Sequence, residues 1–134
     1  MPRDADKEQK NTLKKKDKLK SSLIIEALYK ENRFVVSYPL KCFYSFTEAK
    51  QDKPAVSVAF TVPKKTFKLA VDRNALKRRV REAYRLNYKK VFESFIEQNE
   101  KQLHLFFIYI GKEEASYSCI EEAMQKMLKR LMVG

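Results

Sequence analysis

The sequence predicts an α+β fold: a single domain with a mixed four-stranded sheet flanked by helices, in the order αβββαβα. Three observations support this prediction. Residues 55–62 alternate strictly, residues 103–110 form an apolar run, and residues 73–92 and 118–131 carry apolar side chains at helical spacing. The length of 134 residues suits one domain. Apolar residues make up 44% of the chain, which is enough for a core.

The first twenty residues contain almost no apolar side chains and carry a net charge of +4. This composition predicts a flexible basic N-terminal arm over 1–20, followed by the folded domain over 21–134. Two interpretations of the arm remain open. It is either a solvated tail or a segment that folds onto phosphate groups of a partner.

The sequence of the first half of the domain predicts one helix and one extended segment. After Ser22, residues 23–32 have apolar side chains at helical spacing, and Ser21 or Ser22 can cap the helix. Residues 34–46 are rich in β-branched and aromatic types, but Pro39 predicts a break or an edge strand there. A polar connection follows over 47–54.

Two further strands enclose a long helix. In the strand 55–62, large side chains point to one face and small ones to the other, and Pro63 ends it. The run 103–110 is apolar on both faces, which is typical of a central strand covered on both sides. With the helix between them, these strands predict a parallel βαβ unit, for which the general rule is a right-handed crossover.

The last element is a helix from Ser118 to Leu131. Ser118 and Glu121 have the spacing of a capping box. The helix is amphipathic, with an apolar stripe formed by Ile120, Met124, Met127, Leu128 and Leu131.

The net charge of +12 is concentrated, because residues 55–92 alone carry +9. Such a concentration favours polyanionic partners: RNA, DNA or an anionic membrane surface. No apolar run approaches the roughly 20 residues that cross a bilayer. Without an apolar signal segment at the N-terminus, a cytoplasmic location is expected, with Cys42 and Cys119 reduced.

The helix from residue 73 to 90 is expected to have an apolar and a basic face. Asp72 is a good N-cap candidate. The buried stripe is predicted to contain Leu76, Val80, Ala83 and Tyr84. Beside it, a helical projection predicts one exposed basic ridge of Asn74, Lys77, Arg78, Arg81 and Arg85. Like charges at this spacing repel one another, so the ridge predicts an anionic partner.

These residues carry a resemblance to a known family. The run Lys64-Lys65, then Arg73-Asn74, Lys77-Arg78 and Arg81-Glu82-Ala83-Tyr84-Arg85 resembles the signature of the bacterial ribonuclease P protein component. The resemblance covers roughly residues 12–132. It implies a sheet flanked by helices, of the type found in the second domain of ribosomal protein S5. It also implies a left-handed βαβ crossover, which we expect here in place of the general rule.

The resemblance also implies a function. Proteins of this family bind the catalytic RNA subunit of ribonuclease P and the single-stranded 5′ leader of precursor tRNA, and the RNA removes the leader with bound magnesium ions. The protein is then an accessory subunit of an endoribonuclease that holds no cofactor by itself. No membrane and no obligate protein partner are expected.

Site residues follow from the resemblance position by position. RNA contacts are expected from Lys64, Lys65, Arg73, Asn74, Lys77, Arg78, Arg81 and Arg85. A weaker match places Ile25, Tyr29 and Tyr44 in the leader cleft. Both tyrosines are open to a second interpretation as core residues. The chain departs from the family pattern at Asn32, which replaces a glycine, and in the loop 66–68.

The sequence supports three other functions less well. A ribosomal or general RNA-binding protein remains possible on the charge alone. A DNA-recognition helix is disfavoured because packed Arg and Lys suit phosphate better than bases. A nuclease acting alone is disfavoured because His104 is the single histidine, in an apolar run. The carboxylates Asp72 and Glu82 would stand about 15 Å apart on a helix, too far to share a metal pair.

Overall fold

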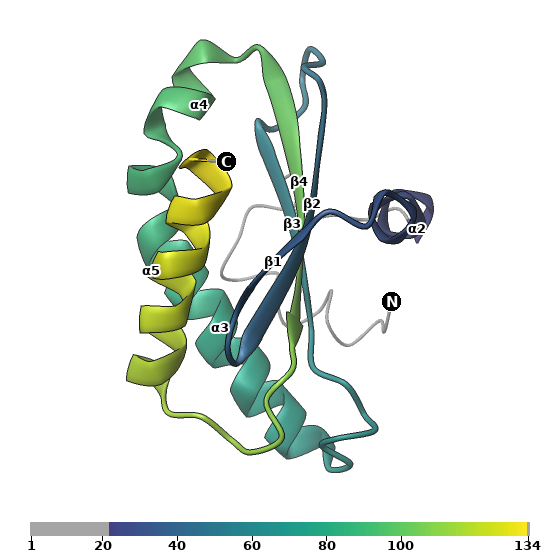
Figure 1. The fold of residues 1–134 in the computed structure, drawn as a ribbon, viewed down its shortest axis with the longest axis vertical. Helices are drawn as coiled ribbons and strands as arrows, with labels where there is room; N and C mark the ends of the chain where they lie inside the picture. Colours follow the sequence, from purple (N-terminus) through teal and green to yellow (C-terminus); the bar gives the residue numbers. More distant parts are fainter. Residues whose placement is uncertain (1–21, 134) are drawn as a thin grey trace.

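A computed structural model describes residues 22–133. Its elements are α2 (Ser22–Glu31), β1 (Phe34–Ser37), β2 (Leu40–Glu48), β3 (Val56–Thr61), α3 (Ala70–Val91), α4 (Glu93–Gln98), β4 (Lys101–Tyr109) and α5 (Tyr117–Val133). Figure 1 shows three layers, in which α2 covers one face of the sheet and α3, α4 and α5 lie on the other. The expected arm over 1–20 falls outside the described residues.

The sheet has four strands in the order β1-β2-β4-β3. β1 pairs with β2 and β2 with β4 in antiparallel fashion, whereas β3 and β4 are parallel. The predicted mixed α+β sheet and the βαβ unit are therefore confirmed. The extended segment divides into two strands at the Tyr38–Pro39 turn, which confirms the break expected at Pro39. One detail differs from prediction, because the short helix α4 was not anticipated.

The main core lies between the sheet and the helices α3 and α5. Alternate residues of β3 point into it, with Val56, Val58 and Phe60 all buried as predicted. The rings of Phe60 and Phe107 stack at 5.5 Å, and Tyr84 of α3 packs on both. The predicted apolar stripes of both helices are buried here: Leu76, Val80, Ala83, Tyr84, Ile120, Met124, Met127, Leu128 and Leu131.

A smaller core lies under α2 on the opposite face of the sheet. Leu28 is fully buried there against Phe43, Ala59 and Phe106. Asn32 follows the helix in the left-handed region, at φ 54°. An asparagine adopts that conformation at low cost, which explains how it replaces a glycine at this turn.

The caps predicted for α3 and α5 are wrong by a few residues. Helix α3 begins two residues before Asp72, with Leu69 at the N-cap and no side-chain bond to it. Helix α5 begins at Tyr117, and the Oγ of Ser116 accepts a hydrogen bond from the N–H of Cys119 at 3.3 Å. Ser116 therefore does the capping that the sequence pattern assigned to Ser118, and the helix begins at the residue between the two serines.

Helix α5 binds one carbonyl oxygen at an edge of the sheet. Strand β1 lies at this edge, and Arg130 of α5 donates a hydrogen bond to the carbonyl oxygen of Val36. At the end of β4, Gly111 passes close to the turn between β1 and β2. An added Cβ there would lie 2.9 Å from Cβ of Pro39, so no larger residue fits without a shift.

His104 makes stability depend on pH. Its side chain is 7% exposed on β4, with Nε2 3.0 Å from Oγ1 of Thr47. Burial, reinforced by Lys50 and opposed by Glu31, lowers the pKa of His104. The unfolded chain therefore binds a proton more tightly than the native protein, and stability falls as pH drops below about 6.5.

We expect urea unfolding to give a lower free energy of unfolding at pH 5.5 than at pH 7.5. His104→Gln should remove most of this difference, because the chain has no other histidine. An equally steep difference in the variant would show that another group titrates.

The two cysteines should differ sharply in reactivity. Cys42 is fully buried, which raises the pKa of its thiol, whereas Cys119 is exposed on α5. Because the thiolate is the reactive form, a thiol reagent should label about one thiol per native chain and both after denaturation. Labelling of both thiols in the native protein would contradict this burial.

Candidate nucleic-acid interface

The loop between β3 and α3 presents Lys64 and Lys65 to solvent. Pro63 ends the strand, and the N–H of Phe67 closes a turn on its carbonyl oxygen at 3.1 Å. The ring of Phe67 packs against Tyr109, 5.6 Å away. The backbone of the loop is thus anchored on the core, while both lysine side chains remain exposed.

Arg73 holds this loop from the first turn of α3. Its Nη1 donates to the carbonyl oxygens of Phe67 and Lys68, each at 2.9 Å. The guanidinium for which an RNA contact is expected therefore binds the backbone of the loop. In this conformation Arg73 positions the loop that carries the two lysines.

The predicted single exposed ridge along α3 is wrong. Lys77 and Arg81 are buried, with only 6% and 4% of each residue exposed. Both positions border the apolar stripe, where a long side chain can lay its stem along the core surface. A helical projection treats every side chain as radial and therefore placed them outside. Asn74 is half-buried.

The two remaining arginines of the signature differ in their partners. Arg85 is exposed but forms a double contact with Glu82, at 2.6 Å from Nε to Oε1 and 3.1 Å from Nη2 to Oε2. This pair lowers the pKa of Glu82 and raises that of Arg85. Arg78 is exposed and makes no hydrogen bond or ion pair with any residue of the described range 22–133.

A groove that the sequence did not reveal lies beside Arg78. Its volume is about 330 Å³, and it is lined by Arg78, Arg79, Glu82 and Tyr117. The first three belong to α3, and Tyr117 is the first residue of α5. Arg79 is fixed at its wall by the carbonyl oxygen of Ala115 and the carboxylate of Glu114, both at 2.9 Å.

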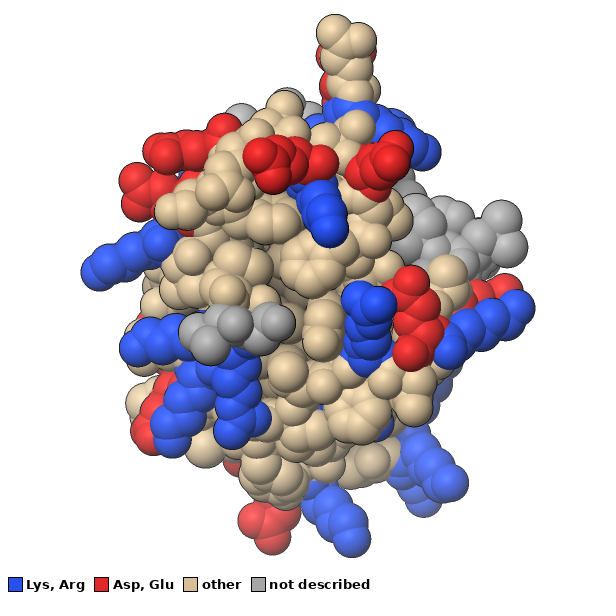
Figure 2. All heavy atoms as spheres, turned by 45° about the horizontal axis from the view of Figure 1, so that its top comes forward, with Lys and Arg blue, Asp and Glu red and all other residues tan. Residues whose placement is uncertain are grey.

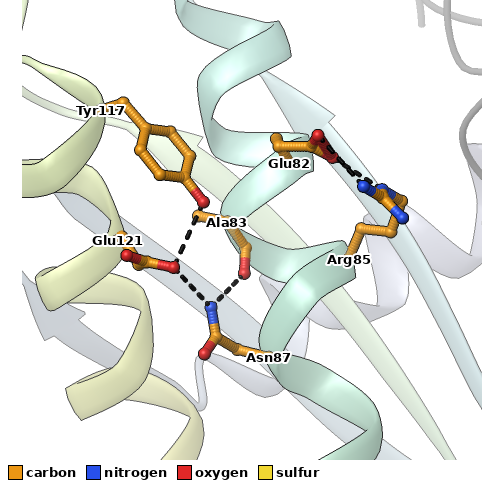
Figure 3. A network of polar contacts seen from close by, with 6 residues as sticks. All are labelled: Glu82, Ala83, Arg85, Asn87, Tyr117 and Glu121. Carbon is orange, nitrogen blue, oxygen red and sulfur yellow. Dashed lines mark hydrogen bonds and ion pairs between the residues drawn. The ribbon is translucent and has the colours of Figure 1, made fainter.

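Tyr117 is held by a polar network between α5 and α3 (Figure 3). Its hydroxyl donates to Oε2 of Glu121 at 3.2 Å, and the same oxygen lies 3.4 Å from Nδ2 of Asn87. Asn87 also donates to the carbonyl oxygen of Ala83 at 2.7 Å. Burial and the Glu121 carboxylate raise the pKa of Tyr117, so its hydroxyl stays protonated at neutral pH.

An aromatic cluster lies on the other face of the sheet, beside α2. The ring of Tyr29, 48% exposed, lies 4.7 Å from that of Phe43 and 5.8 Å from that of Phe106. Nζ of Lys41 lies 4.3 Å from the ring centroid of Phe34 and 4.9 Å from that of Phe43. Exposed rings and a cation thus share one surface.

Tyr44 does not belong to this cluster, and of the two interpretations left open for it the structure supports that of a core residue. Its side chain packs against the main core, with its ring 6.1 Å from that of Phe46. Successive residues of a strand point to opposite faces, and the aromatic residue facing α2 is therefore Phe43. The side chain of Ile25 lies outside the part of the chain that the structure describes.

Charged side chains are unevenly distributed. On the face drawn in Figure 2, several acidic side chains lie near the top of the view, and Lys and Arg side chains project from its lower half.

Among residues 22–133, no three His, Cys, Asp or Glu side chains gather as metal ligands would. None of the helices described is long and apolar enough to cross a bilayer.

A small α+β domain with exposed lysines and an arginine beside one long helix defines a class of proteins that bind polyanions. The family model of ribonuclease P matches residues 13–132. The chain therefore belongs to the ribonuclease P protein family. Membership identifies it as an RNA-binding component of a ribonucleoprotein that acts in tRNA processing, and it implies association with the RNA of ribonuclease P.

Relatives support this assignment along most of the chain. The ribonuclease P protein component of Chlorobium phaeobacteroides is 35% identical over 128 residues, covering 91% of this chain and 86% of the relative. That of Porphyromonas gingivalis is 34% identical over 108 residues, covering 80% and 77%.

Solved structures show the same fold. The Staphylococcus aureus RNase P protein matches with a TM-score of 0.64 at 17% identity, covering 87% of this chain and 96% of that one. The Thermotoga maritima RNase P protein matches with a TM-score of 0.65 at 22% identity, covering 84% and 96%.

Proposed function

We propose that this protein is the cytoplasmic accessory subunit of ribonuclease P and docks on the catalytic RNA through Lys64, Lys65 and Arg78. The observation that carries the proposal is their exposure in a chain that matches the family from residue 13 to 132. Arg78 makes no ion pair with the described residues, so its guanidinium can bind phosphate oxygens bidentately.

The second RNA segment in this proposal is the single-stranded 5′ leader of precursor tRNA. Its site is the aromatic cluster beside α2, where Tyr29 and Phe34 are exposed and Lys41 lies over two rings. Aromatic faces stack on any base, and a nearby cation attracts the backbone, which suits a leader of variable sequence.

The chemical step is assigned to the RNA partner with its magnesium ions. The carboxylates Asp72 and Glu82 of α3 stand about 15 Å apart along the helix, too far to hold two metal ions together. Glu82 is bound to Arg85 in addition. The protein's part is to hold the leader and the catalytic RNA in one orientation, which lowers the magnesium concentration that the reaction needs.

The test is reconstitution with a bacterial ribonuclease P RNA and a precursor tRNA. We expect the purified protein alone to leave the substrate intact, and to stimulate cleavage by the RNA at low magnesium concentration. Cleavage by the protein alone, or no stimulation of the RNA, would contradict the proposal.

Tyr29 provides a separate test of the leader site. A stacked base is worth about 1–3 kcal/mol, so Tyr29→Ala should weaken binding of precursor tRNA to the holoenzyme roughly 5- to 150-fold. Binding of mature tRNA, which has no leader, is the control and should not change. Equal losses for both tRNAs would indicate a general defect instead. Tyr44→Ala, on the opposite face, should not discriminate between the two tRNAs.

A further inference from the structure

The groove between α3 and the start of α5 combines a ring with a cation. Tyr117 forms one wall, and Arg78 and Arg79 lie along α3. Its volume of about 330 Å³ lies at the low end for ligand pockets and suits one small planar group better than a helix or a strand.

The ring of Tyr117 is fixed before any partner arrives. Glu121 accepts a hydrogen bond from its hydroxyl at 3.2 Å and also contacts Asn87 of α3, so α5 and α3 hold the ring from one end (Figure 3). Gln125 adds a contact to Asn87 at 3.2 Å, one turn further along α5. A ring held in this way loses little freedom on binding, which favours stacking.

Most charged side chains around the groove are bound to other groups of the protein, and one cation is not. Glu82 is bound at both oxygens by Arg85, and Arg79 is bound by Glu114. Glu121 is engaged by Tyr117 and Asn87. Arg78 alone among the groove's residues has no partner in the described range, so it supplies the attraction for an anion.

We propose that this groove binds one unpaired nucleotide of the catalytic RNA, with the base stacked on Tyr117 and the phosphate on Arg78. The inference rests on the proposed function and adds a residue outside the basic signature to the interface. It also commits to a flipped-out nucleotide in place of a uniform duplex backbone, because a duplex offers no free base to the ring.

The test uses the absence of tryptophan from the chain. Tyr117→Trp introduces a single indole into the groove, and Phe95→Trp introduces one into α4, at the opposite end of the molecule (Figure 1). The probe is the catalytic RNA without precursor tRNA. We expect its binding to quench the emission of the first variant by stacking and to leave that of the second unchanged.

Affinity measurements give a second readout. Tyr117→Phe keeps the aromatic face but loses the bond to Glu121, so it should bind the RNA only slightly more weakly than the original protein. Tyr117→Leu, which keeps the bulk without the aromatic face, should bind roughly 5- to 150-fold more weakly. Because Tyr117 carries no charge, the salt dependence of binding should not change. Arg78→Ala should weaken binding and also reduce the salt slope by about one unit.

The outcomes separate the two proposals. Unquenched emission at position 117, or equal affinities for the Phe and Leu variants, would overturn the proposal that the groove binds a nucleotide. The proposed function would still stand if the original protein stimulates the RNA. Failure of the original protein to bind the RNA would overturn both. Thermal unfolding of each variant shows whether a weakened affinity comes from lost structure.

Discussion

Phe107→Ala is expected to lower the free energy of unfolding by about 3–5 kcal/mol, the usual cost of removing a buried ring. Phe107 is 1% exposed at the centre of β4, stacked on Phe60 at 5.5 Å and in contact with Tyr84 at 5.6 Å. The total free energy of unfolding of a native protein is about 5–15 kcal/mol, so the variant loses a large share of its stability. Denaturant unfolding followed by circular dichroism measures the change.

The matched control is Phe34→Ala on the edge strand β1. That ring is 41% exposed, so its removal should cost well under half as much. Similar losses for both variants would mean that the stacked rings at the centre of the sheet contribute no more than a surface contact does.

Replacing both Lys64 and Lys65 by alanine is expected to weaken binding to the catalytic RNA and to flatten its salt dependence. Each phosphate contact contributes about 0.7–0.9 to the slope of log K against log salt, so the double variant should lose about 1.5 units. The loop itself should keep its shape, because Arg73 and Phe67 hold it through the backbone and the core. Filter binding at several salt concentrations measures both quantities.

The control removes the same charge elsewhere. Lys126 and Lys129 are exposed on α5, and Lys126 pairs with Glu122 at 3.3 Å. Their double alanine variant should leave the slope unchanged. A slope equal to that of the original protein after loss of Lys64 and Lys65 would exclude this loop from the phosphate contacts.

Most of the fold could be predicted because its elements have regular periods. The helical stripes of α3 and α5 describe burial directly, and the structure buries each residue of these stripes. The alternation of β3 predicts which side chains enter the main core, although its other face is buried too. The helix α4 was not anticipated, because the usual signals of a helix end are missing from the sequence there. Asn99, at φ 48°, ends the helix in a polar stretch without glycine or proline.

The site was less predictable, for two physical reasons. Lys77 and Arg81 are long enough to follow the core surface, so a charged residue type did not imply an exposed position. Tyr44 and Phe43 are neighbours on β2, and a shift of one residue moves a side chain to the other face. The groove at Tyr117 depends on a contact between helices far apart in the chain, for which no local pattern exists.

The bond from Arg130 to Val36 has a consequence for self-association. A strand at the border of a sheet carries backbone groups that can pair with a second molecule, and natural proteins cover or charge such borders. Here a guanidinium from the last helix donates a hydrogen bond to one of those carbonyl oxygens. Arg130→Ala would leave this carbonyl oxygen of β1 open to intermolecular pairing, so the variant should sediment as larger species while the original protein remains monodisperse.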